Sequence, residues 1–105
     1  MRILFDQGTP GPLRRALTAH VVSTAYEMGW TRLGNGALLR AAEAQFDILV
    51  MSGKNIRHQQ NVAGSRLAIL VLPTTDWLNI RTHQAQVIAA VDALRAGDFV
   101  DLHFA

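Results

Sequence analysis

The chain has 105 residues, of which half are apolar and 17% are charged. This length suits one domain with a substantial buried core, and this composition excludes a disordered chain. The absence of cysteine excludes disulfides, thiolate nucleophiles and cysteine-based metal sites. The net charge is +2, from ten basic and eight acidic side chains. This balance permits an acidic or nucleic-acid partner without requiring one.

The sequence also carries information about the compartment. No apolar run approaches the roughly 20 residues that a membrane-spanning helix needs, so no membrane partner is expected. The first residues have the pattern of a strand and lack the features of a signal peptide. We therefore expect a cytoplasmic protein.

Short apolar runs that alternate with helical patterns predict an α/β domain. Continuous apolar runs are typical of strands buried on both faces, and alternating apolar and polar residues are typical of an edge strand. The expected strands are 2–5, 21–24, 46–51, 67–72 and, at an edge, 99–104. The expected helical segments are 13–19, 25–30, 37–45, 55–60 and 77–96. We expect one three-layer α/β/α domain over residues 1–105, with a mostly parallel sheet of about five strands.

Three of the expected strands are followed by residues that could take part in catalysis or ligand binding. Asp6 follows the first strand, Ser52 and Gly53 end the third, and Asp76 follows the fourth. The carboxyl ends of parallel strands share one edge of the sheet, where open α/β sheets bind ligands. Asp6 is thus a candidate catalytic residue, and equally a candidate for an Asx-type bond within the turn. Asp76 is the other carboxylate expected at this edge, although it also suits the cap of the following helix.

A polar and basic segment, 54–61, follows the third strand. Lys54, Asn55, Arg57 and His58 are candidates for binding phosphate groups, or else they form a solvated loop. The glycine spacing of a P-loop is missing, and His58 has no second histidine at metal-binding spacing.

Three other notable residues are expected to have structural roles. Asp47 begins its strand, so it should lie about 15 Å from the edge that holds Asp6. Trp30 and Trp77 are expected to pack against the sheet, with base stacking as the less favoured alternative.

In the order of its pieces the chain resembles small bacterial PIN-like proteins, the DUF5615 group, within the superfamily of PIN-domain nucleases. The similar segments, in order, are MRILFDQGTPGPLRR, TAYEMGW, NGALL, FDILVMSGKNIRHQQN and LAILVLPTTDW. The resemblance implies a PIN-like fold and a toxin–antitoxin-type ribonuclease that gathers carboxylates around Mg²⁺ or Mn²⁺ to hydrolyse RNA. Such a metal activates water and neutralises phosphate charge, and it prefers oxygen ligands.

Carried over by position, the resemblance assigns Asp6 to the first metal-binding acid and breaks at two others. Ala37 stands where the family has glutamate, and Gly53 stands where it has a second acid; a lysine follows. Asp6 and Asp76 remain as candidate metal ligands. We therefore predict a degenerate metal site with weak or no catalysis.

Three functions remain as alternatives. The first is a toxin-like ribonuclease with a reduced site. The second is a non-catalytic nucleic-acid binder that uses the 54–58 segment. The third is a protein-interaction module, either a homodimer or one half of a pair with an antitoxin-like protein.

Overall fold

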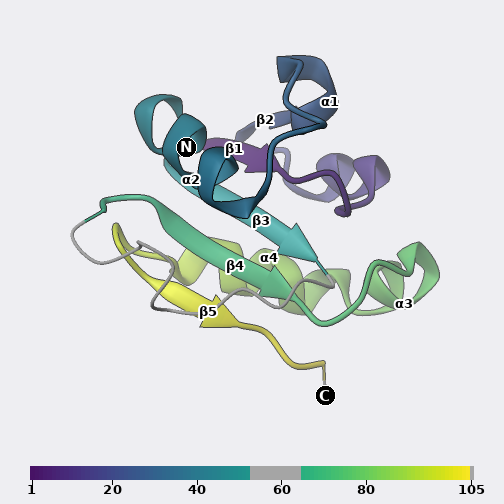
Figure 1. Ribbon diagram of the computed structural model, residues 1–105. Helices are drawn as coiled ribbons and strands as arrows, with labels where there is room; N and C mark the ends of the chain where they lie inside the picture. Colours follow the sequence, from purple (N-terminus) through teal and green to yellow (C-terminus); the bar gives the residue numbers. More distant parts are fainter. Residues whose placement is uncertain (53–64, 105) are drawn as a thin grey trace.

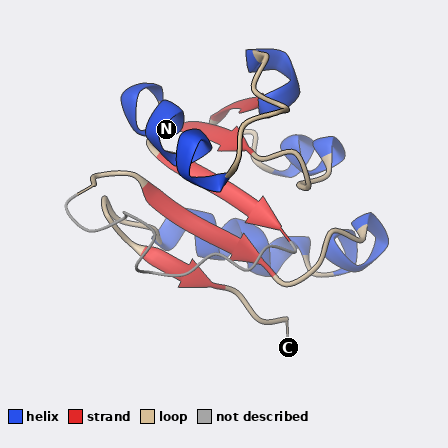
Figure 2. Cartoon of the chain, viewed as in Figure 1, coloured by secondary structure: helices blue, strands red, loops and turns tan. Residues whose placement is uncertain are grey.

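The protein is described by a computed structural model over residues 1–52 and 65–104. Its five strands form one parallel sheet in the order β2-β1-β3-β4-β5 (Figure 1). The strands are β1 (Arg2–Phe5), β2 (Val21–Thr24), β3 (Ile48–Ser52), β4 (Ala68–Leu72) and β5 (Phe99–Asp101). Helices pack on both faces of this sheet (Figure 2), which confirms the predicted three-layer α/β architecture.

The helical elements of the structure differ from the predicted segments in their bounds and, at two places, in their geometry. They are the 3-10 helix η1 (Gly11–Ala16) and the α-helices α1 (Ala25–Met28), α2 (Asn35–Gln45), α3 (Trp77–Thr82) and α4 (Gln84–Ala93). The helix expected at 55–60 lies outside the described residues. No helix in the described ranges has the length and apolar character needed to cross a membrane.

The α-helix expected at 13–19 is instead the shorter 3-10 helix η1. The backbone amide of Leu13 donates to the Pro10 carbonyl, and that of Leu17 donates to the Arg14 carbonyl. These three-residue spacings define a 3-10 helix. Pro10 and Pro12 fix the backbone and supply no amide hydrogen, so this short connection forms few helical bonds of its own.

The prediction of a single long helix at 77–96 is also wrong. The helix is interrupted at His83, and its second part, α4, ends at Ala93. The His83 ring nitrogen Nδ1 lies 2.9 Å from the Asn79 carbonyl oxygen. The same ring stacks on Phe104 with 4.4 Å between ring centres. His83 therefore forms a local hydrogen bond and packs on the C-terminal segment. The helix is interrupted at this residue.

The sheet separates two apolar cores. Successive strand residues point to opposite faces, so β1 contributes Ile3 and Phe5 to one core and Leu4 to the other. The first core lies under η1, α3 and α4, and the second lies under α2. Because β3 and β4 are covered on both faces, every one of their residues is buried. This explains their apolar sequence, in which Ser52 at the end of β3 is the one polar residue.

Two crossover connections bring the helical elements η1 and α3 side by side. The β1–β2 and β4–β5 crossovers run in opposite directions across the sheet, yet both pass over the face that carries η1, α3 and α4. Two such crossovers have opposite hands, although parallel strands are nearly always joined with one hand. As a result α3 contacts η1, and both elements lie toward the ends of the strand arrows in Figure 1.

Candidate functional site at the carboxyl edge of the sheet

The strand order creates a switch point between β1 and β3. From β1 the chain moves to β2 on one side, and it then crosses back to β3 on the other side. A crevice outside the carboxyl ends of the strands at such a point is where doubly wound α/β proteins bind ligands. Asp6 follows β1 directly, and its amide donates to the Val50 carbonyl of β3 at 3.0 Å. The structure therefore places Asp6 at the predicted edge and next to β3.

The Asp6 carboxylate belongs to a buried polar group that we call the rim cluster, formed by Asp6, Thr9 and Ser52. Asp6 is 2% exposed, and Thr9 and Ser52 are also buried. Thr9 Oγ1 lies 2.6 Å from Asp6 Oδ1, 3.0 Å from the Val50 carbonyl oxygen and 3.1 Å from Ser52 Oγ. A hydroxyl has one hydrogen, and the short contact with a carboxylate is the stronger bond. Thr9 thus donates to Asp6 and can accept from Ser52.

The turn after β1 supplies a second bond to the same carboxylate. The Gly8 amide donates to Asp6 Oδ1 at 3.2 Å, which is the Asx-type bond that the sequence left open. A Cβ atom at Gly8 would lie 3.2 Å from the Ser52 carbonyl oxygen and 3.5 Å from Thr75 Cγ2. Glycine is therefore needed for the turn to approach both β3 and the loop before α3.

Asp76 acts as the cap of α3. Its Oδ1 accepts from the Leu78 amide at 3.2 Å, and its own amide donates to Thr74 Oγ1 at 3.0 Å. The capping interpretation from the sequence is therefore the one that the structure shows.

The described residues do not fit the metal site that the resemblance implies. A divalent cation in a hydrolytic site takes several carboxylate oxygens. Within 1–52 and 65–104, no three side chains of the His, Cys, Asp or Glu type gather closely enough to hold a metal. Asp6 Oδ1 accepts from Thr9 and Gly8, and Asp76 caps a helix.

The position where the resembled family has glutamate lies near the same edge. Gln7, next to Asp6, donates through Nε2 to the carbonyls of Trp30, Thr31 and Leu33, at 3.1 to 3.2 Å. These bonds fasten the connection between α1 and α2 to the carboxyl edge. Ala37 lies in the first turn of α2, which has no acidic residue.

The remaining predicted site residues are not placed. Gly53 and the phosphate-binding candidates Lys54, Asn55, Arg57 and His58 lie outside the described residues. Asp47 is placed, and it lies at the opposite edge as expected. Its Oδ2 accepts from the amide of Arg2 at the start of β1, at 2.8 Å.

The structure reveals a basic groove that the sequence interpretation missed. A shallow depression of about 380 Å³ between η1 and the α3–α4 pair is lined by Pro12, Arg15, Ala16, Trp77, Arg81 and Gln84. A second depression shares Pro12 and Arg15 with it. No acidic residue lines either depression, and neither Arg15 nor Arg81 pairs with an acid of the described chain. We call this surface the η1–α3 groove.

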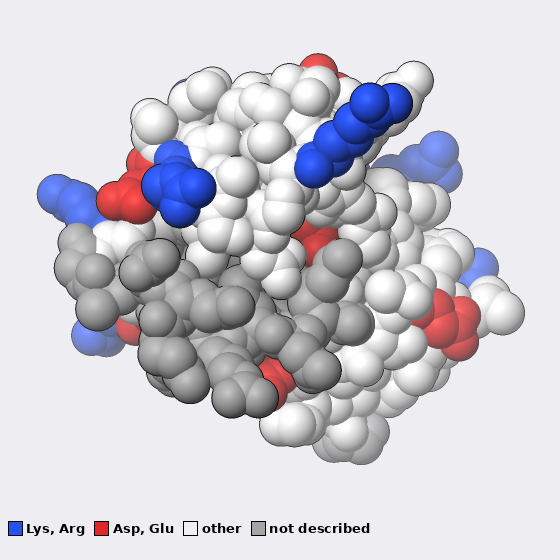
Figure 3. Space-filling model, in the orientation of Figure 1, with Lys and Arg blue, Asp and Glu red and all other residues white. Residues whose placement is uncertain are grey.

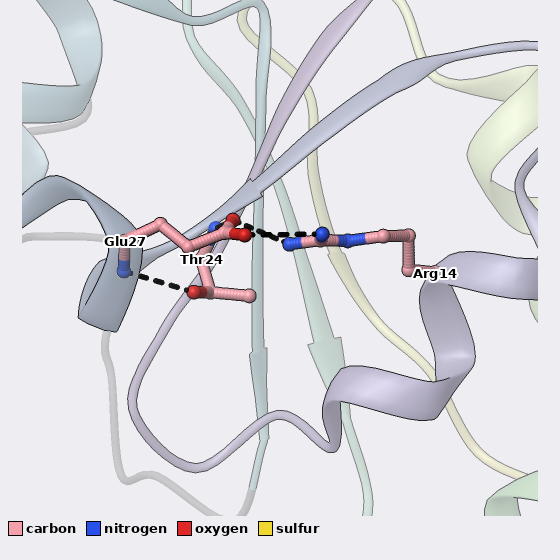
Figure 4. A network of polar contacts seen from close by, with 3 residues as sticks. All are labelled: Arg14, Thr24 and Glu27. Atoms are coloured by element: carbon pink, nitrogen blue, oxygen red, sulfur yellow. Dashed lines mark hydrogen bonds and ion pairs between the residues drawn. The ribbon is translucent and has the colours of Figure 1, made fainter.

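Trp77 and Arg14 complete the surroundings of the groove. Trp77 packs on the first core, as predicted, while its half-buried ring also lines the groove. Arg14 lines the second depression, and its guanidinium binds the Glu27 carboxylate through Nη1 and Nη2 (Figure 4).

Glu27 has a structural role in this chain. It forms a capping box with Thr24 at the start of α1: the Thr24 amide donates to Glu27 Oε1 at 2.9 Å, and the Glu27 amide donates to Thr24 Oγ1 at 3.1 Å. Its ion pair with Arg14 then joins α1 to η1 (Figure 4).

This network predicts a pH effect on stability. The hydrogen bond from Arg14, and then that from the Thr24 amide, lower the pKa of Glu27 below 4.5. A carboxyl group with a lowered folded-state pKa stabilises the fold above its unfolded pKa, and this contribution is lost as pH falls through the folded value. Glu27→Gln should therefore be less stable than the wild type at neutral pH and equally stable in acid, as measured by urea denaturation. A gap that persists in acid would contradict this assignment. Since the pair is exposed, the gap should be small.

Comparisons with known proteins identify no relative. No protein-family model, curated protein or solved structure matches this chain.

Proposed function

We propose that this chain is a PIN-like protein, a relative of toxin–antitoxin-type ribonucleases, and that it binds RNA with weak or no cleavage because its metal site is degenerate. The observation that carries this proposal is the rim cluster. Asp6 lies at the switch point of a parallel sheet, and its carboxylate is bound by Thr9 and Gly8. Without an activating metal, several kcal/mol of transition-state stabilisation are lost, at about tenfold in rate for each 1.4 kcal/mol.

The η1–α3 groove supports the binding half of the proposal. Arg15 and Arg81 are exposed on its two walls, and the absence of lining acids leaves their charges available for phosphates. Trp77 lines the same groove and offers an aromatic surface to a base. Arginines beside an aromatic ring are a combination that binds single-stranded nucleic acid without reading its sequence.

Charge reversal in the groove tests RNA binding. We expect the double variant Arg15→Glu/Arg81→Glu to bind a labelled single-stranded RNA at least tenfold more weakly than the wild type. The slope of log K against log salt is negative, and its magnitude should decrease by about 0.7 for each lost phosphate contact. Fluorescence anisotropy over a salt series measures both quantities.

The matched control is Arg40→Glu, because Arg40 is exposed on α2, over the opposite face of the sheet. It makes the same charge change per residue outside the groove. An Arg40→Glu variant that loses as much affinity per charge as the groove variant would contradict the groove assignment. Absence of binding by the wild type at low salt would contradict RNA binding altogether.

A protein-interaction module is the competing proposal, and one exposed residue favours it. Leu78 is 62% exposed on α3, next to Trp77. A partner covering this apolar side chain would be a second copy of the chain or an antitoxin-like protein. Light scattering that shows a dimer, and a monomer for Leu78→Ser, would support the homodimer; a wild type that is monomeric at all concentrations would contradict it.

A further inference from the structure

A separate cavity lies at the amino ends of the strands, on the opposite edge from Asp6. It has a volume of about 450 Å³, within the range of small-molecule sites in proteins. The starts of β1, β3 and β4, the end of α2 and the segment that follows α4 contribute its walls. Figure 3 shows cationic and anionic side chains interspersed along the left edge of the molecule, where the strands begin.

Three arginines from different parts of the chain line this cavity: Arg2, Arg66 and Arg95. All three are exposed, and none of them forms an ion pair with an acid of the described residues. Arginine offers a planar fork of donors that fits carboxylate and phosphate oxygens. Three such forks around one cavity favour an anionic ligand.

Two acids also line the cavity, and they do not cancel its charge. Asp47 Oδ2 already accepts from the Arg2 amide at 2.8 Å, and Glu43 is the other acidic residue of the lining. Three arginines and two acids leave a net positive charge of one on the side chains. The excess suits a ligand with a small, compact anionic group.

The rest of the lining favours an apolar body on that ligand. The Arg2 guanidinium carbon lies 5.1 Å from the centre of the Phe46 ring, a cation–π contact that orients the guanidinium. Leu67 and Leu94, which are 4% and 6% exposed, line the cavity as well. Arginines beside apolar side chains can together hold a small organic anion, because polar groups fix the orientation of a ligand whose apolar part contacts apolar surface.

We propose that this amino-edge cavity binds a small organic anion, a carboxylate or a phosphate monoester attached to an apolar group. The arginine forks hold the anionic oxygens, and the apolar group lies against Leu67, Leu94 and Phe46. The site is on the other edge of the sheet from the rim cluster and the η1–α3 groove. Ligand binding at this site can therefore be tested independently of RNA binding.

The test is a titration of the full chain with phenyl phosphate, with benzoate and with inorganic phosphate. Calorimetry or NMR measures the dissociation constant of each probe. We expect phenyl phosphate or benzoate to bind at least tenfold more tightly than inorganic phosphate, and the stronger of the two identifies the head group. The double variant Arg66→Gln/Arg95→Gln should weaken that binding at least tenfold. Arg15→Gln/Arg81→Gln, which removes two positive charges at the other edge, should leave it unchanged.

Three outcomes would overturn the proposal. One is that no probe binds at millimolar concentration. Another is that the two double variants weaken binding equally, which would indicate a general charge effect. The third is that inorganic phosphate binds as tightly as the aromatic probes, which would leave the apolar lining without a role. Circular dichroism of each variant checks that the fold is retained.

Discussion

Restoring the two missing acids, with Ala37→Glu and Gly53→Asp, should produce Mn²⁺-dependent RNA cleavage at least a hundredfold faster than that of the wild type. The resemblance to PIN-like nucleases puts acids at these two positions. The structure places Ala37 in the first turn of α2, whose preceding segment Gln7 fastens to the edge that holds Asp6. Three carboxylates with a bound metal would supply several kcal/mol of transition-state stabilisation, and about 2.7 kcal/mol corresponds to a hundredfold in rate. A fluorogenic RNA assay with Mn²⁺ and with EDTA measures the effect.

The matched control carries amides of the same size, Ala37→Gln and Gly53→Asn, and it should stay inactive because amides do not supply the negative charge. Asp6→Asn in the restored background should also abolish cleavage. If the wild type already cleaves RNA and Asp6→Asn removes that activity, the proposal of a degenerate site is wrong. If the restored variant binds Mn²⁺ and leaves RNA intact, the relationship to metal-dependent nucleases loses its support.

Thr9→Val should destabilise the fold by about 2–3 kcal/mol, because it removes a donor from a buried carboxylate. The Thr9 hydroxyl contacts Asp6 Oδ1 at 2.6 Å and Ser52 Oγ at 3.1 Å, and all three residues are buried. Valine puts a methyl group where the hydroxyl was, too close to the carboxylate oxygen. Urea denaturation followed by circular dichroism measures the free energy of unfolding.

Thr9→Ser separates the hydroxyl from the methyl group. Serine keeps the hydroxyl and loses one methyl group, so it should cost only about 0.8 kcal/mol. Equal losses in the two variants would show that packing, and not the hydrogen bond to Asp6, makes Thr9 important. A Thr9→Val variant as stable as the wild type would contradict the structural role of the rim cluster.

The strands were predictable because their burial is recorded in local composition. β3 and β4 are buried on both faces, so their apolar runs identify them directly. Gly97, with a φ of +84°, lies in the turn before β5, close to where the pattern ended the last helix.

The interruption of the helix at His83 was not predictable, since it involves stacking on Phe104, a contact between residues distant in the sequence. Local periodicity carries no information about such a partner.

The candidate site shows the same division. The position of Asp6 follows from one rule about parallel strands, so the sequence was sufficient. The contact of its partner Thr9 with Ser52 requires β1 to lie next to β3, which only the strand order decides. The η1–α3 groove depends on two crossovers that pass over the same face of the sheet, which brings Arg15 and Arg81 to one surface. The sequence could not indicate that pairing.

The position of β1 between β2 and β3 has a consequence for synthesis on the ribosome. Ile3 and Leu4 align with Ile48 and Leu49, so β1 cannot complete its pairing until residue 50 or so has left the exit tunnel. Until then β1 can pair with β2 alone, and its other edge stays open in the emerging polypeptide. Such a nascent segment is a natural target for early chaperone contact.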